Sequence, residues 1–221
     1  MEGCAEGEIV QVLRALLVLL LWLVLLCLTA RAVGRCIRMG WRLTVLSAFT
    51  VCGVLVWLAS ELLSAFSQLA LWGSAAFWII SALILWATGA AGSTSRHAEA
   101  RHLSKIGLSS RLILPLLCSA VVIGILFLIA FVAAPNTYDS MTYHLSRVMH
   151  WQQNRSLRFF PTHIPRQLHA GPWAEMAVLY LQMLAGSDHL ANLVQWFAMI
   201  GSVIGVSYIA KIMGDLGRRK R

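Results

Sequence analysis

Charged residues are scarce in this sequence: Asp, Glu, Lys and Arg make up 12% of its 221 residues. A soluble domain carries about 25% charged residues, so this scarcity excludes an ordinary soluble domain and a disordered tail. The five cysteines form no CxxC pair, and the longest polar segment contains none of them. The cysteine pattern therefore excludes a disulfide-rich secreted module and predicts no zinc site.

Hydrophobic residues make up 59% of the chain and lie in long runs. About twenty residues of helix cross the hydrocarbon core of a bilayer, and a lone strand would leave its backbone unpaired in lipid. The predicted spans are Ile9–Ala30, Leu43–Leu63, Leu71–Ala91, Leu112–Ala133 and Leu190–Ala210. We therefore expect an all-α fold, a polytopic membrane helix bundle with about five spans, whose first partner is the lipid bilayer.

The net charge of +9 comes from short basic clusters between the apolar runs. This distribution reflects membrane topology rather than nucleic-acid binding, and no nucleic acid is expected as a partner. Basic-rich and basic-poor segments alternate along the chain, which predicts an outside N-terminus, an outside long loop and a cytoplasmic C-terminus. Because the segment before the first run is acidic, unlike the positive leader of a signal peptide, we expect this run to stay as a span.

Three segments follow from this pattern. Residues 1–133 are expected to form four transmembrane helices, and residues 134–189 an extracytoplasmic loop. Residues 190–221 are expected to form the fifth transmembrane helix and a basic cytoplasmic tail.

The long loop holds five of the seven histidines and most of the side chains that could do chemistry. Pro135 ends the fourth span, and the polar residues after it can cap a new helix. In that helix, apolar and polar residues fall on different faces: Met141, Leu145, Val148 and Met149 on one, and Asp139, Tyr143, Arg147 and His150 on the other. A second helix is predicted from Pro172 to about Ala185, ended by Gly186. Both are expected to be amphipathic and to lie at the membrane interface.

Three stretches of the loop carry a distinctive sequence: APNTYDSMTYHLSRVMHW at 134–151, FPTHIPRQ at 160–167 and PWAE at 172–175. Together with LANLVQW at 190–196, they resemble bacterial glycosyltransferases of the GT-C superfamily, which are similar to protein mannosyltransferases and lipid A aminoarabinose transferases. The resemblance implies a multi-pass enzyme of the bacterial inner membrane whose large extracytoplasmic loop contains two juxtamembrane helices. It also implies a polyprenyl-phosphate-linked sugar as donor.

In this family an acidic residue at the start of the loop is the catalytic base or a metal-linked carboxylate, and Asp139 is the residue that matches. Arg147 and Arg166 are expected to bind the leaving phosphate, because a guanidinium pairs well with phosphate. The other residues expected to contact substrate are Tyr143, His144, His163 and Glu175. Asp139 is also the one expected ligand for a divalent ion such as Mg²⁺ or Mn²⁺, although Ser140 follows it where some relatives have a second carboxylate.

Each of these residues also has a simpler interpretation. Asp139 can cap a helix, and the two arginines can anchor the loop to lipid headgroups. Glu175 can interact with the dipole at a helix start, and the histidines can be structural hydrogen-bonding groups whose spacing fits no metal template.

Two functions therefore stay open at the level of sequence. The first is a membrane glycosyltransferase, or the N-terminal part of one, acting on the extracytoplasmic side. The alternative is a non-catalytic membrane protein derived from such an enzyme, with a C-terminal remainder or a partner subunit as its partner. A small transporter finds little support, because no span centre carries a charged pair.

Overall fold

The computed structural model describes residues 2–36, 40–90 and 110–219, and every regular element in these ranges is a helix. Five helices are long and apolar enough to cross a membrane. These helices are α1 (Glu2–Cys36), α2 (Trp41–Ala65), α3 (Leu71–Ala90), α4 (Ser110–Val132) and α8 (Asn192–Arg219). The expectation of an all-α, polytopic bundle with five spans is confirmed.

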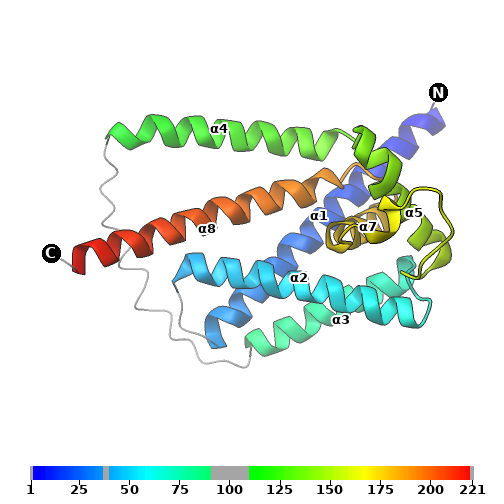
Figure 1. Ribbon diagram of the computed structural model, residues 1–221, viewed down its shortest axis with the longest axis horizontal. Helices are drawn as coiled ribbons and strands as arrows, with labels where there is room; N and C mark the ends of the chain where they lie inside the picture. Colours follow the sequence, from blue (N-terminus) through cyan, green and yellow to red (C-terminus); the bar gives the residue numbers. More distant parts are fainter. Residues whose placement is uncertain (1, 37–39, 91–109, 220–221) are drawn as a thin grey trace.

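The long helices alternate in direction, so successive connections fall at opposite ends of the bundle (Figure 1). The N-terminus and the segment between α4 and α8 lie at one end, and the C-terminus lies at the other. This arrangement is the one that five antiparallel spans require. Of the basic residues between the third and fourth predicted spans, Arg96, Arg101 and Lys105 lie outside the described residues.

The segment between α4 and α8 contains a π-helix (Ser140–His144), α5 (Leu145–Asn154), the short α6 (Arg166–His169) and α7 (Trp173–Ala185). The start and end of α7 agree with the sequence prediction. Pro172 precedes it, and Gly186 ends it with a φ of 76°, a left-handed conformation that glycine adopts without steric cost. The sequence did not predict α6, because the two prolines nearby indicated irregular structure.

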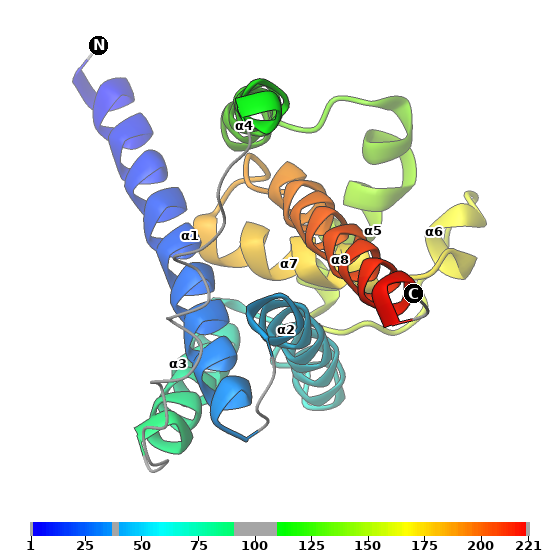
Figure 2. The same ribbon diagram turned by 90° about the vertical axis from the view of Figure 1, so that its left-hand side faces the viewer.

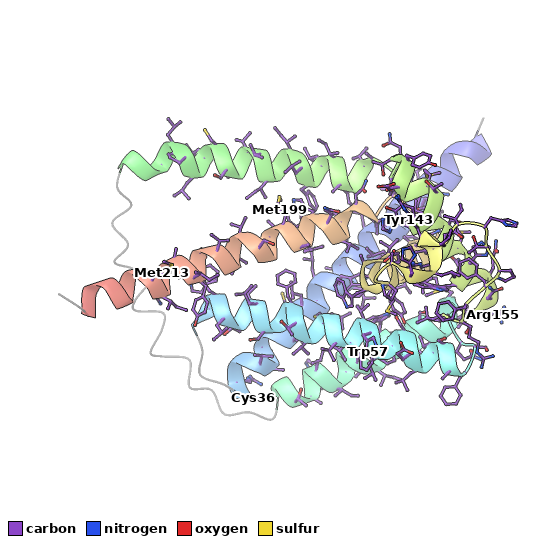
Figure 3. The ribbon with its side chains drawn as sticks, viewed as in Figure 1. Cys36, Trp57, Tyr143, Arg155, Met199 and Met213 are labelled. Carbon is purple, nitrogen blue, oxygen red and sulfur yellow. The ribbon has the colours of Figure 1, made fainter. Side chains whose placement is uncertain are left out.

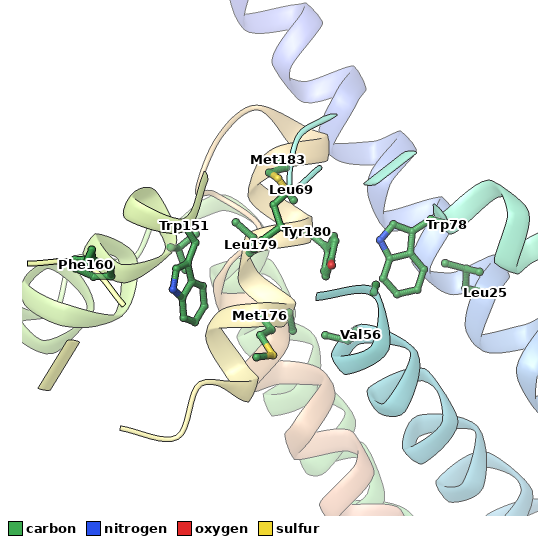
Figure 4. Packing of buried hydrophobic residues seen from close by; sticks show 13 residues of the cluster. Leu25, Val56, Leu69, Trp78, Trp151, Phe160, Met176, Leu179, Tyr180 and Met183 are labelled. Atoms are coloured by element: carbon green, nitrogen blue, oxygen red, sulfur yellow. The ribbon is translucent and has the colours of Figure 1, made fainter. Parts of the chain in front are cut away.

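Helix α7 occupies the centre of one end of the bundle rather than its surface. It crosses the long helices and packs against α1, α2 and α3 on one side and α5 on the other (Figure 2). Tyr180 is fully buried, in edge-to-face contact with Trp78, and its hydroxyl lies 3.3 Å from Ser60 Oγ. Most of the surface of α7 is therefore covered by other helices rather than left exposed, as an amphipathic helix with one open face would be. Its apolar residues pack against the spans and α5 in one core (Figure 4).

Helix α4 is attached to the rest of the molecule through α8. The Trp196 indole donates a hydrogen bond to the Ile123 carbonyl at 3.1 Å. At the loop end, the Asn192 amide donates to the Ala133 carbonyl at 2.8 Å. Helix α8 in turn contacts α2, where Arg42 Nε donates to Ser207 Oγ at 3.1 Å. The bond between Asn192 and Ala133 thus joins the two ends of the segment that carries the candidate site.

Candidate functional site

The site begins at a π-helix that the sequence did not predict. Thr137 caps it, because its hydroxyl accepts a hydrogen bond from the Ser140 amide at 3.2 Å. The Asp139 side chain makes no capping bond, so its simpler interpretation as a helix cap is not what the structure shows. A π-helix inserts an extra residue into the helical repeat and is frequently found at functional sites. Here it rotates the residues that follow relative to a regular helix.

This rotation changes the role of Arg147. The expected water-facing face of the first loop helix included Arg147, but this residue is 1% exposed and is buried in the protein together with Val148 and Trp151. A side chain this deeply buried is not open to a phosphate from outside. The expected role of Arg147 in phosphate binding is therefore corrected to a structural one.

The Arg147 guanidinium donates hydrogen bonds to three backbone carbonyls in and just after α6. Nη1 donates to the Ala170 carbonyl at 3.0 Å, Nη2 to the Arg166 carbonyl at 2.9 Å, and Nε to the Gln167 carbonyl. These three carbonyls belong to α6 and the residue that follows it, so the guanidinium ties this turn to α5. Arg147 thus fixes the turn from which Arg166 projects.

Gln167 supports the same turn, although the sequence analysis gave it no role. It is 4% exposed, and its amide nitrogen donates to the Thr142 carbonyl at 2.8 Å and to Ser146 Oγ at 2.9 Å. Its amide oxygen accepts from Thr162 Oγ1 at 2.6 Å. The position of Gln167 next to Arg166, in a motif rich in proline, was the only signal for it. A buried glutamine cannot be told from an exposed one by sequence alone.

Glu175 joins α7 to the first loop helix. Its Oε1 lies 2.8 Å from His144 Nδ1 and 3.4 Å from Arg147 Nη1. The Glu175 side chain is 3% exposed, whereas the His144 side chain is 43% exposed. The structure therefore brings together three predicted site residues, as a buried ion pair with a half-exposed imidazole on one side.

Asp139, Tyr143 and Arg166 form an outer cluster next to this group. The Tyr143 hydroxyl interacts with the Asp139 carboxylate and with the Arg166 guanidinium, which lies over the Tyr143 ring at 5.8 Å. Partial burial and the negative charge of Asp139 raise the pKa of Tyr143, and the positive charge of Arg166 opposes this shift. Asp139 and Arg166 are both exposed, at the loop end of the bundle where Figure 3 labels Tyr143.

The outer cluster and the buried group are contiguous, because the rings of Tyr143 and His144 lie 4.2 Å apart. His163 is exposed on the turn before α6, and none of the contacts above involves it. Within the described ranges, no three His, Cys, Asp or Glu side chains gather in a way that could hold a metal ion. A divalent ion at Asp139 would therefore have to take its remaining ligands from outside these side chains, for example from water.

An apolar cavity of about 270 Å³ lies on the other side of α7. Its walls come from α1, α2, α7 and α8, and they include Trp22, Phe49, Trp173 and Phe197. Trp173 closes part of it, with its indole donating to the Gly53 carbonyl at 3.2 Å. Neither Asp139 nor Arg166 is among the residues that line this cavity. Helix α7 therefore separates the apolar space from the polar cluster.

A comparison of the sequence with models of protein families, with curated proteins and with solved structures found no match.

Proposed function

We propose that this chain is a membrane glycosyltransferase, or part of one, that takes a sugar from a polyprenyl-phosphate carrier. Transfer would occur on the side of the membrane where the long loop lies, the extracytoplasmic side of a bacterial inner membrane. The observation that carries the proposal is the outer cluster: an exposed carboxylate, Asp139, beside a tyrosine hydroxyl and an exposed cation, Arg166.

The chemistry of glycosyl transfer assigns a role to each member of this cluster. Asp139 takes the proton of the acceptor hydroxyl as that oxygen attacks the sugar carbon. Arg166 pairs with the phosphate oxygens that carry the negative charge as the old bond breaks. Tyr143 contacts both of these groups and stays a neutral hydroxyl, because its pKa is raised. The apolar cavity between α1, α2, α7 and α8 offers space of the right character for an isoprenoid chain.

The test is transfer by the purified chain in lipid vesicles, with polyprenyl-phosphate donors radiolabelled on the sugar. Asp139→Asn is expected to lower the rate by about 10²- to 10⁴-fold, because general-base catalysis contributes about that much. Asp188→Asn, the same substitution in the same loop outside the cluster, is the control and should leave the rate unchanged. Wild-type rates in Asp139→Asn would contradict the assignment of the base.

A second function is favoured by one specific observation, the separation of Asp139 from the apolar cavity by α7. A non-catalytic membrane protein or partner subunit needs no connection between the two. That function requires that the purified chain transfers no sugar from any lipid-linked donor, whereas transfer by the chain alone would exclude it.

A further inference from the structure

The His144 imidazole is held by one specific atom of a buried carboxylate. Glu175 Oε1 lies 2.8 Å from His144 Nδ1, and the same oxygen lies 3.4 Å from Arg147 Nη1. Arg147 cannot move to follow another partner, because three backbone carbonyls also hold its guanidinium. The carboxylate is therefore fixed in place, and it fixes the imidazole in turn.

This contact determines which ring nitrogen carries a proton. A carboxylate facing a guanidinium is a hydrogen-bond acceptor, so His144 Nδ1 must be the donor. When the ring is neutral, Nε2 therefore carries no proton and can only accept a hydrogen bond. When the ring is protonated, Nε2 carries an N–H that is not bonded to Glu175 and is free to donate to a ligand. The 43% exposure of the His144 side chain leaves the ring accessible from outside.

The charges around His144 favour an anion as its ligand. Glu175 on α7 and Arg147 on α5 cancel each other, so a protonated His144 adds a net positive charge. On the outer side, Tyr143 touches the His144 ring, and its raised pKa keeps it uncharged up to alkaline pH. Beyond Tyr143 lie the Arg166 cation and the Asp139 carboxylate. Protonated His144 and Arg166 would thus be two cations that both contact Tyr143, and a phosphate group binds well to such a pair.

We propose that protonated His144 binds the phosphate of the lipid-linked donor through Nε2–H and serves as the general acid, with Glu175 and Arg147 as positioning residues. This inference rests on the proposed function. As the acceptor oxygen bonds to the sugar carbon, Asp139 takes the acceptor's proton and the bond between sugar carbon and phosphate oxygen breaks. The electron pair stays on that oxygen, which receives the Nε2 proton. Neutral His144, with its proton on Nδ1, is the product form, and exchange with water resets both groups.

The probe for this site is farnesyl methyl phosphate, a phosphodiester whose single negative charge is constant between pH 5.5 and 8.5. The full chain in lipid nanodiscs should bind it at least tenfold more weakly at pH 8.5 than at pH 5.5, because only the protonated ring carries the positive charge and the Nε2–H that the phosphate accepts. His144→Gln should bind weakly and equally at both pH values. His150→Gln, the same substitution six residues further along, should behave like wild type, because the His150 ring stacks on Phe160 instead.

Glu175→Gln removes the acceptor of the Nδ1 proton, but it also leaves buried Arg147 without its counter-charge, and this variant can fail to fold. A ¹⁵N NMR measurement on wild-type protein avoids this difficulty. Neutral His144 is expected in the Nδ1–H form, whereas a free imidazole prefers the Nε2–H form. Binding that is independent of pH or of His144, no binding at either pH, or an Nε2–H form would each overturn the inference.

The two proposals fail in different ways. If Asp139→Asn loses transfer while His144→Gln transfers and binds like wild type, the proposed function stands and the role of His144 is wrong. If wild type binds the probe in the expected pH-dependent way but transfers no sugar, the phosphate site at His144 stands and the proposed function is wrong.

Discussion

Two arginines of the loop show how far the role of one side chain depends on its surroundings. Arg147 and Arg166 have the same chemistry and were expected to share one role, but Arg147 is buried and Arg166 is exposed. Burial of Arg147 is tolerated because Glu175 supplies a counter-charge and three backbone carbonyls accept hydrogen bonds from the guanidinium. A buried charge is stable only under such conditions.

Replacing Arg147 should therefore destabilise the protein strongly. Arg147→Met is expected to lower the free energy of unfolding by about 3–5 kcal/mol, because it removes the guanidinium that balances the buried Glu175 carboxylate. Tryptophan fluorescence during thermal unfolding in detergent would measure the change. The exposed Arg158 provides the control, and Arg158→Met should stay within about 0.5 kcal/mol of wild type. Equal stability of the two variants would contradict the structural role of Arg147, and Arg147→Met with Glu175→Met should recover part of the loss.

At the scale of elements, α7 organises the site. Its Trp173, Ala177 and Leu181 follow each other at intervals of four residues and line the apolar cavity. Glu175 lies two residues from Trp173, which is about 200° around the helix, and faces α5 instead. Helix α7 thus presents an apolar face to the cavity and the Glu175 carboxylate to His144 and Arg147. The residues at which α7 begins and ends determine where both faces lie.

The end of α7 can be tested at Gly186. Gly186→Ala should cost about 1 kcal/mol of stability, because the φ of 76° is unfavourable for a residue with a Cβ. Gly205→Ala in α8 is the matched control, since a Cβ there meets nothing within 4 Å. The control should be neutral or slightly stabilising, because alanine is the better helix former. Thermal unfolding of the two variants side by side gives the comparison, and a neutral Gly186→Ala would exclude this explanation of the helix end.

At the scale of the whole molecule, the described chain places the N-terminus and the loop helices at one end and the C-terminus at the other. The alternation of basic clusters predicts which end faces the cytoplasm. Because Asp139, Tyr143, His144 and Arg166 lie at the loop end, this orientation also decides which compartment these side chains face.

Orientation can be measured with single cysteines in a cysteine-free background. A maleimide that does not cross membranes should label Asn154→Cys in intact cells, because Asn154 is exposed at the end of α5. Gly214→Cys, exposed near the other end of α8, should react only after the cells are permeabilised. The reverse pattern would show that the loop faces the cytoplasm, and it would remove the extracytoplasmic reaction from the proposal.

The sequence by itself determined the five apolar spans, the all-helical fold and the limits of α7, because hydrophobic length, proline and glycine act locally. It also singled out Asp139, Tyr143, His144, Arg166 and Glu175, which the structure gathers at one end of the bundle. Only the tertiary structure decided that Arg147 turns inward, that Gln167 supports the turn and that α7 is buried among the spans. The physical reason is that the π-helix shifts the helical repeat by one residue, and that burial of a polar group depends on partners distant in the chain.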